Sequence, residues 1–86
     1  MMTLGEIIRD RRTSKGMSLR KLAKLCAITA PYLSDIELGR RLPSASVQES
    51  IGGCLGLSPF LLPRLVQHEK AEALRRKYEA MTGKKI

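Results

Sequence analysis

The stretch SLRKLAKLCAITAPYLSDIELG spans residues 18–39 and decides the fold. Its first part places apolar residues at helical spacing, and Ser18 can cap the first turn. Its second part begins with Thr29, another capping residue, and continues with an apolar stripe of the same period. The spacing therefore predicts helices over about 18–26 and 29–38. Only a tight turn separates them, so the pair forms a helix-turn-helix unit.

Further helices are predicted on both sides of this unit. Apolar residues recur at helical spacing between Thr3, which can cap, and Lys15, which precedes a glycine. The same pattern recurs after Ser44 and ends at Gly56. The chain is thus expected to be all-α.

The last third of the chain is also helix-favouring but contains two prolines. Ser58 and Pro59 have the form of a helix start, with a cap and a proline in the first position. Pro63 then lies too deep for a regular helix, so the helix either kinks there or a new one begins.

A stripe of residues near the C-terminus has the spacing 3, 4, 3, which suits a short coiled-coil seam for a homodimer. Its members are Ala71, Leu74, Tyr78 and Met81. Two alternatives are that this helix folds back onto the domain, or that it leads to a partner domain. Lys84, Lys85 and Ile86 are expected to be a disordered end.

Length and charge limit the class of protein. Eighty-six residues build one modest core, and a net charge of +8 with a pI near 10.1 favours a polyanionic partner. Nucleic acid comes first, and an anionic membrane surface second. The charge is +5 over residues 1–43 and +3 over residues 44–86. No apolar run or leader suggests a membrane span or secretion, so a cytoplasmic protein is expected.

Composition also weighs against catalysis. The chain has one histidine, no paired carboxylates in an apolar setting and no glycine-rich phosphate loop, so we expect no enzyme and no catalytic residue. Cys26 and Cys54 lack a CxxC partner and fall at core-facing positions, where they are expected as small buried hydrophobes. Neither a metal nor a cofactor is predicted.

The segment from Leu4 to about Leu62 resembles the Cro/repressor-type helix-turn-helix family, the xenobiotic-response-element-like transcriptional regulators of bacteria and phage. The resemblance implies a compact five-helix, lambda-repressor-like DNA-binding domain over residues 1–62, with a C-terminal helical extension over 63–86. The residues that carry the resemblance are Leu4, Ile8, Gly16-Met17-Ser18, Leu22-Ala23, Ile28-Thr29, Tyr32-Leu33-Ser34, Ile36-Glu37, Gly39 and Arg40-Arg41-Leu42-Pro43-Ser44.

Three positions depart from the family pattern. Ala27 stands where glycine is usual, so the turn needs either a negative φ or some strain. Leu19 stands where glutamine is frequent, which leaves backbone N–H groups for a phosphate there. Arg11 stands where an apolar residue is frequent.

The resemblance also implies roles for single residues. Arg12 and Glu37 would form a shielded ion pair between the first helix and the recognition helix. The implied base-reading residues are Ala30, Pro31, Ser34 and Asp35. The residues expected near phosphates are Ser18, Leu19, Arg20, Lys21, Thr29, Tyr32, Arg40 and Arg41.

This reading set is unusual because it lacks the arginine, lysine, asparagine and glutamine side chains that contact guanine or adenine bidentately. Specificity would rest on van der Waals fit, water bridges or DNA shape. Asp35 either accepts from a cytosine or pairs locally with Arg40 or Arg41.

The predicted function is sequence-specific binding of double-stranded DNA by a transcriptional regulator, a repressor that acts as a homodimer on an inverted repeat. The alternative is an antitoxin or protein-interaction module whose C-terminal helix binds a protein partner and whose DNA readout is weak.

Overall fold

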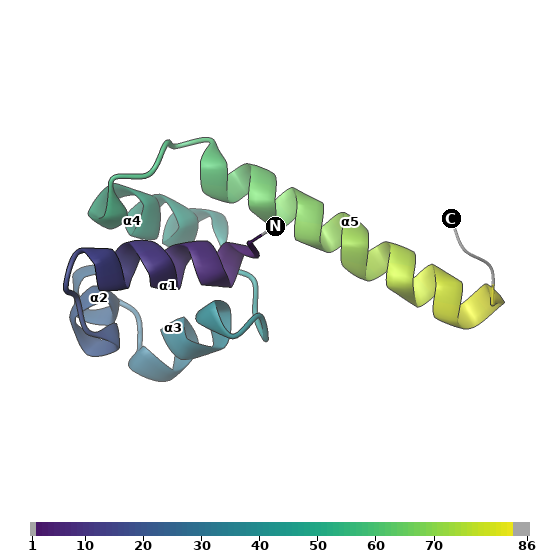
Figure 1. Ribbon diagram of the computed structural model, residues 1–86, viewed down its shortest axis with the longest axis horizontal. Coiled ribbons are helices and arrows are strands. Elements are labelled where there is room, and N and C mark those ends of the chain that lie inside the picture. The colour runs from purple at the N-terminus through teal and green to yellow at the C-terminus, as the bar shows by residue number, and fades with distance from the viewer. Residues whose placement is uncertain (1, 84–86) are drawn as a thin grey trace.

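The computed structural model describes residues 2–83, so the predicted end at 84–86 lies outside it. Within the described residues, five α-helices and no strands are present. Four helices build a globular body, and the fifth crosses it and then projects away from it (Figure 1). The molecule measures 44 × 24 × 22 Å. The helices are α1 (Leu4–Ser14), α2 (Leu19–Leu25), α3 (Ala30–Glu37), α4 (Ala45–Leu55) and α5 (Leu61–Thr82).

Helices α1 to α4 each begin with a hydroxyl cap. The side-chain oxygen of the residue before the helix accepts a backbone N–H three positions later, which satisfies one free donor of the first turn. In α1 the cap is reciprocal, because the Thr3 N–H donates to Glu6 at 2.8 Å and this hydrogen bond lowers the pKa of Glu6. The other caps are Ser18, Thr29 and Ser44. These starts confirm the cap positions predicted from the sequence.

One apolar core joins all five helices. Leu62 and Val66 belong to it, so the first two turns of α5 are part of the globular body. The division expected after residue 62 therefore falls inside a helix that is continuous through Thr82. The buried core residues are Leu4, Ile8, Leu22, Ala23, Cys26, Leu33, Ile36, Ile51, Leu55, Leu62 and Val66.

The crossing of α1 over α3 depends on Gly5. A Cβ atom at this position would lie 2.5 Å from the carbonyl oxygen of Ile36 and would also collide with the carbonyl group of Glu37. The missing side chain lets the first turn of α1 rest on the backbone at the end of α3.

The start of α5 differs from the prediction at Ser58 and Pro59. The helix begins at Leu61, and no side chain caps it, because the Ser58 hydroxyl accepts the N–H of Phe60 at 3.4 Å instead. Pro63 is consequently the third residue of α5, where a backbone N–H has no partner within the helix in any case. A kink or a second helix is not needed, and the prediction of one was wrong.

The second half of α5 does not fold back onto the body. Leu74, Tyr78 and Met81 expose 69%, 48% and 77% of their surface. The fold-back alternative is therefore wrong for this chain. The helix is fastened near its middle instead, where the Glu69 carboxylate accepts the N–H of Leu4 at 2.6 Å.

Both cysteines are free thiols, and the predicted burial holds fully for Cys26 but only in part for Cys54. Cys26 is buried and Cys54 half-buried, and they interact across the contact between α2 and α4. Burial, reinforced by the neighbouring Cys54, raises the pKa of the Cys26 thiol to about 12. Cys26 therefore stays protonated at neutral pH and acts as a small core residue.

Candidate nucleic-acid interface

The turn between α2 and α3 is closed by backbone hydrogen bonds. The N–H groups of Cys26 and Ile28 donate to Leu22 and Ala23, each at 3.0 Å. Ala27, between them, has φ of 54°, in the left-handed region that disfavours residues with a Cβ. Of the two conformations left open by the sequence, the turn adopts the strained one.

The end of α3 is fixed to α1 by a buried ion pair. Arg12 Nε donates to Glu37 Oε2 at 2.8 Å, and Nη2 donates to Oε1 at 3.0 Å. The third donor, Nη1, reaches the carbonyl oxygen of Met17 at 2.8 Å. The hydrogen bonds to Glu37 raise the pKa of Arg12, so the guanidinium stays charged at neutral pH. Arg12 is turned inward and is not available to a partner, as the structural assignment of this residue requires.

The four predicted base-reading residues lie together on the first two turns of α3. Pro31 is exposed, and Ala30, Ser34 and Asp35 are half-buried. None of the four has the bidentate reach of a longer polar side chain. These four positions of α3 thus present two apolar and two short polar side chains.

The basic residues after α3 have partners within the chain. Arg40 Nη1 lies 3.8 Å from Asp35 Oδ1, and both groups keep substantial contact with solvent. Such an exposed and long pair is weak. The guanidinium of Arg41 lies over the ring of Tyr32, 5.5 Å from its centre. Asp35 therefore pairs locally in the free protein, which is the second of the two roles left open for it.

An open notch separates the N-terminal ends of α2 and α3. It brings together residues that the sequence predicts at phosphates and residues that it predicts at base edges. Its lining consists of Ser18, Leu19, Arg20, Ala30, Pro31 and Ser34.

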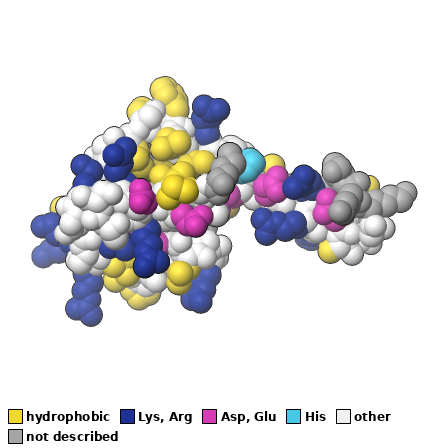
Figure 2. Space-filling model, in the orientation of Figure 1, with side chains coloured by type: hydrophobic (Ala, Val, Ile, Leu, Met, Phe, Trp, Pro, Cys, Tyr) yellow, Lys and Arg dark blue, Asp and Glu magenta, His cyan; other side chains and the backbone are white. Residues whose placement is uncertain are grey.

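Exposed cations surround this region. Arg20, Lys21 and Lys24 are exposed on α2, and Arg40 and Arg41 are exposed just after α3. Figure 2 shows Lys and Arg side chains along the α1, α2 and α3 side of the body, with hydrophobic surface between them over α3. The arrangement is a cationic face with an apolar centre.

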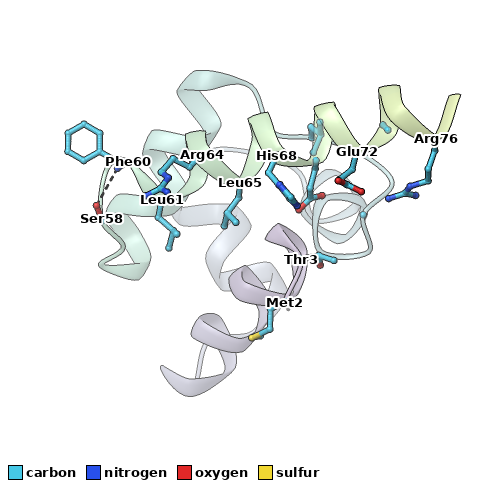
Figure 3. Close-up of a pocket in the computed structure, with 14 residues that line it drawn as sticks. Met2, Thr3, Ser58, Phe60, Leu61, Arg64, Leu65, His68, Glu72 and Arg76 are labelled. Atoms are coloured by element: carbon cyan, nitrogen blue, oxygen red, sulfur yellow. Dashed lines mark hydrogen bonds between the residues drawn. The ribbon is translucent and has the colours of Figure 1, made fainter. Parts of the chain in front are cut away.

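A second and larger hollow lies along α5, away from the notch (Figure 3). It is bounded by the chain before α1, the loop after α3 and the first half of α5. Its lining includes charged residues of both signs, namely Arg64, Glu69, Glu72 and Arg76. Within residues 2–83, no three His, Cys, Asp or Glu side chains are grouped as metal ligands. No helix of that part of the chain is long and apolar enough to cross a lipid bilayer.

Three features of the interface were missed by sequence reasoning. The sequence predicts a phosphate contact from the backbone of Leu19 but no role for its side chain, which lines the notch with Ala30 and Pro31. The Tyr32 and Arg41 pair was also missed, although a tyrosine and an arginine flanking one short helix could have signalled it. Gly5 gave no signal, because its role depends on a crossing between helices that are distant in sequence.

Comparison with known proteins gives a consistent result. A family model described as a helix-turn-helix domain matches residues 3–65. The HTH-type transcriptional regulator DdrOP3 of Deinococcus deserti is 37% identical over 57 residues, which are 66% of this chain and 44% of that protein. The immunity repressor protein of Bacillus phage phi105 is 32% identical over 74 residues, 83% of this chain and 51% of that protein. The chain thus spans about half the length of these curated relatives.

Solved structures agree with the sequence relatives. The crystal structure of SinR, the master regulator for biofilm formation, in complex with DNA superimposes with a TM-score of 0.64 at 33% identity. The match covers 70% of this chain and 97% of the SinR chain.

Proposed function

The chain belongs to the helix-turn-helix domain family, and from this premise we propose that it is a sequence-specific DNA-binding transcriptional regulator, a repressor that binds an inverted repeat as a homodimer. The observation that carries the proposal is the juxtaposition of the notch and the first turns of α3 on one cationic face. The similarity to a repressor and to a DNA-bound regulator supports it.

The proposed readout uses α3 in the major groove. Ala30 and Pro31 would contact base edges through hydrocarbon, and Ser34 would donate or accept a hydrogen bond. Asp35 would lie beside Arg40, whose positive charge offsets the repulsion between this carboxylate and the phosphates. Direct polar readout is thus limited, and shape and van der Waals fit contribute a larger share.

The proposed affinity comes from phosphate contacts that surround the reading positions. Exposed cations on α2 and after α3 would neutralise phosphates, and backbone N–H groups and capping hydroxyls would add neutral hydrogen bonds. Tyr32 would hold Arg41 toward the backbone. The residues proposed for phosphate contact are Ser18, Leu19, Arg20, Lys21, Thr29, Tyr32, Arg40 and Arg41.

The proposed dimer uses the exposed stripe of α5. Ala71, Leu74, Tyr78 and Met81 lie on the half of the helix that projects from the body, where they have little intramolecular cover. A two-fold arrangement would place two α3 helices in successive major grooves, roughly 34 Å or about 10 base pairs apart.

The decisive experiment is selection of bound duplexes from a random pool at about 150 mM salt, where nonspecific binding is suppressed. The solution mass is measured in parallel. We expect a palindromic motif and a dimeric mass. A folded protein that enriches no motif would contradict the proposal.

A second candidate function is favoured by the weakly polar reading surface of α3. In that case the chain is an antitoxin or interaction module, and the α5 stripe binds a protein of another kind. The two functions differ in salt dependence, because neutralisation of phosphates gives a steep fall of affinity with salt on a log–log plot. A flat dependence on nonspecific DNA would favour the interaction module.

A further inference from the structure

The notch between α2 and α3 has an apolar wall and a cationic surround. Its lining includes three hydrocarbon side chains, from Leu19, Ala30 and Pro31, although it opens to solvent. Leu19 and Ala30 pack against the core from the other side, so the notch has a fixed apolar wall.

The surroundings of this apolar wall are cationic. Arg20 belongs to the lining itself, and Lys21 is exposed on the same helix turn. A purely apolar partner would leave these charges unused, and a purely anionic one would leave the wall uncovered. The occupant that fits both is a small hydrocarbon group carried on a polyanion.

Duplex DNA offers one such group in the major groove. The thymine 5-methyl is the hydrocarbon feature of the base edges, and alanine and similar side chains contact it. We infer that the notch receives the 5-methyl group of one thymine in each half-site and that Leu19 is a specificity-determining residue. Ser34, at the edge of the notch, donates its hydroxyl to the neighbouring O4 of that thymine.

This inference rests on the proposed DNA-binding function but adds a requirement that the function alone does not make. A regulator reading only shape or phosphates is indifferent to a single methyl group. A regulator whose notch is filled by that methyl group loses affinity when the group is removed, because burying one such group changes Kd roughly fourfold.

The test replaces each thymine of the selected operator in turn by deoxyuridine, which lacks only the 5-methyl group. We expect a loss of about fourfold in affinity at one position per half-site and little change elsewhere. A second substitution places 5-methylcytosine at that position opposite guanine. The duplex with 5-methylcytosine should bind more tightly than the duplex with unmodified cytosine at that position. Both carry the same polar base edge, and only the first restores the methyl group.

A protein variant then assigns the effect to the notch. In Leu19→Ala the ratio of thymine to deoxyuridine affinity should fall toward one. Leu25→Ala is the matched control, because Leu25 is on the same helix, is 51% exposed and does not line the notch. Thermal melting of both variants shows whether they are folded, and the DNA substitutions test the notch without any protein change.

The outcomes separate the two proposals. If no motif is selected, the DNA-binding function itself fails. If a motif is selected but no deoxyuridine position weakens binding, the function stands and the thymine assignment is overturned. A sensitive position that is unchanged in folded Leu19→Ala would overturn the role of Leu19.

Discussion

The globular body and the projecting half of α5 are both helical, but the body buries its apolar residues whereas the projecting half exposes them. In the body, each helix buries an apolar face, and the buried charged residue, Arg12, donates a hydrogen bond from each of its three guanidinium nitrogens. Beyond Val66, the helix of α5 carries apolar residues of similar size, but they face solvent. A helical spacing pattern thus identifies a surface to be covered, and only the fold shows whether this chain covers it.

The largest expected effect lies in the body. Arg12→Ala strands the buried Glu37 carboxylate, so we expect a loss of about 3–5 kcal/mol in unfolding free energy, measured by urea denaturation. Arg11→Ala, on the exposed neighbour, is the control and should change little. If Arg12→Ala melted normally but lost DNA binding, the residue would belong to the interface rather than to the core.

The next effect concerns the crossing of α1 and α3. Gly5→Ala forces a Cβ into backbone atoms, so we expect destabilisation of about 1–3 kcal/mol. Gly53→Ala is the matched control, because a Cβ there meets nothing within 4 Å. It should stabilise α4 by up to about 1 kcal/mol through helix propensity. If parallel thermal melts showed that both substitutions change the melting temperature in the same direction, the close crossing of α1 and α3 would be contradicted.

A smaller gain is expected in the turn of the helix-turn-helix unit. Ala27→Gly relieves a left-handed conformation that costs roughly 1–2 kcal/mol, less the backbone entropy of glycine, so the net gain is about 0.5–1 kcal/mol. The same change at Ala80, inside α5, should instead be unfavourable. A lower melting temperature for Ala27→Gly would show that the turn is not strained.

The smallest effect on stability is expected in the projecting helix. Leu74→Gln with Met81→Gln should change the unfolding free energy of the isolated chain by less than about 1 kcal/mol, because both residues are exposed. The solution mass should nevertheless fall from dimer to monomer. An unchanged mass would place the dimer contact elsewhere.

Salt should affect self-association through α5 and DNA binding by the body in opposite directions. Lys70, Arg75 and Lys77 border the stripe, and a two-stranded coil brings such flanking residues together. Screening should therefore strengthen self-association measured by sedimentation, whereas it weakens DNA binding. Self-association that weakens with salt would indicate an oppositely charged contact.

The sequence was sufficient for the elements that local chemistry determines. The hydroxyl caps, the stop at Gly56 and the Arg12–Glu37 pair were expected from residue types and spacing, or from the family resemblance, and the structure contains them. The start of α5 was not predicted correctly. A serine such as Ser58 can cap a helix that follows directly, or it can accept an N–H within a turn that precedes the helix, and residue types do not distinguish these two cases.

The contacts of the candidate site were harder to predict, because they depend on how separate helices pack. Leu19 looked like an absence when compared with the family pattern, and its contact with Ala30 and Pro31 depends on how α2 meets α3. For the same reason the sequence does not decide whether Asp35 pairs locally, since the direction of Arg40 depends on the backbone after α3.

The anchoring of α3 at both ends has a consequence for binding thermodynamics. The Thr29 cap fixes its start, and Arg12 links its last residue to α1 and to the carbonyl of Met17 before α2. The conformational entropy of this helix is therefore lost when the protein folds, and no further loss is needed when a ligand binds. Association of the body should be close to rigid docking, with a heat-capacity change set by buried surface alone and no contribution from coupled folding.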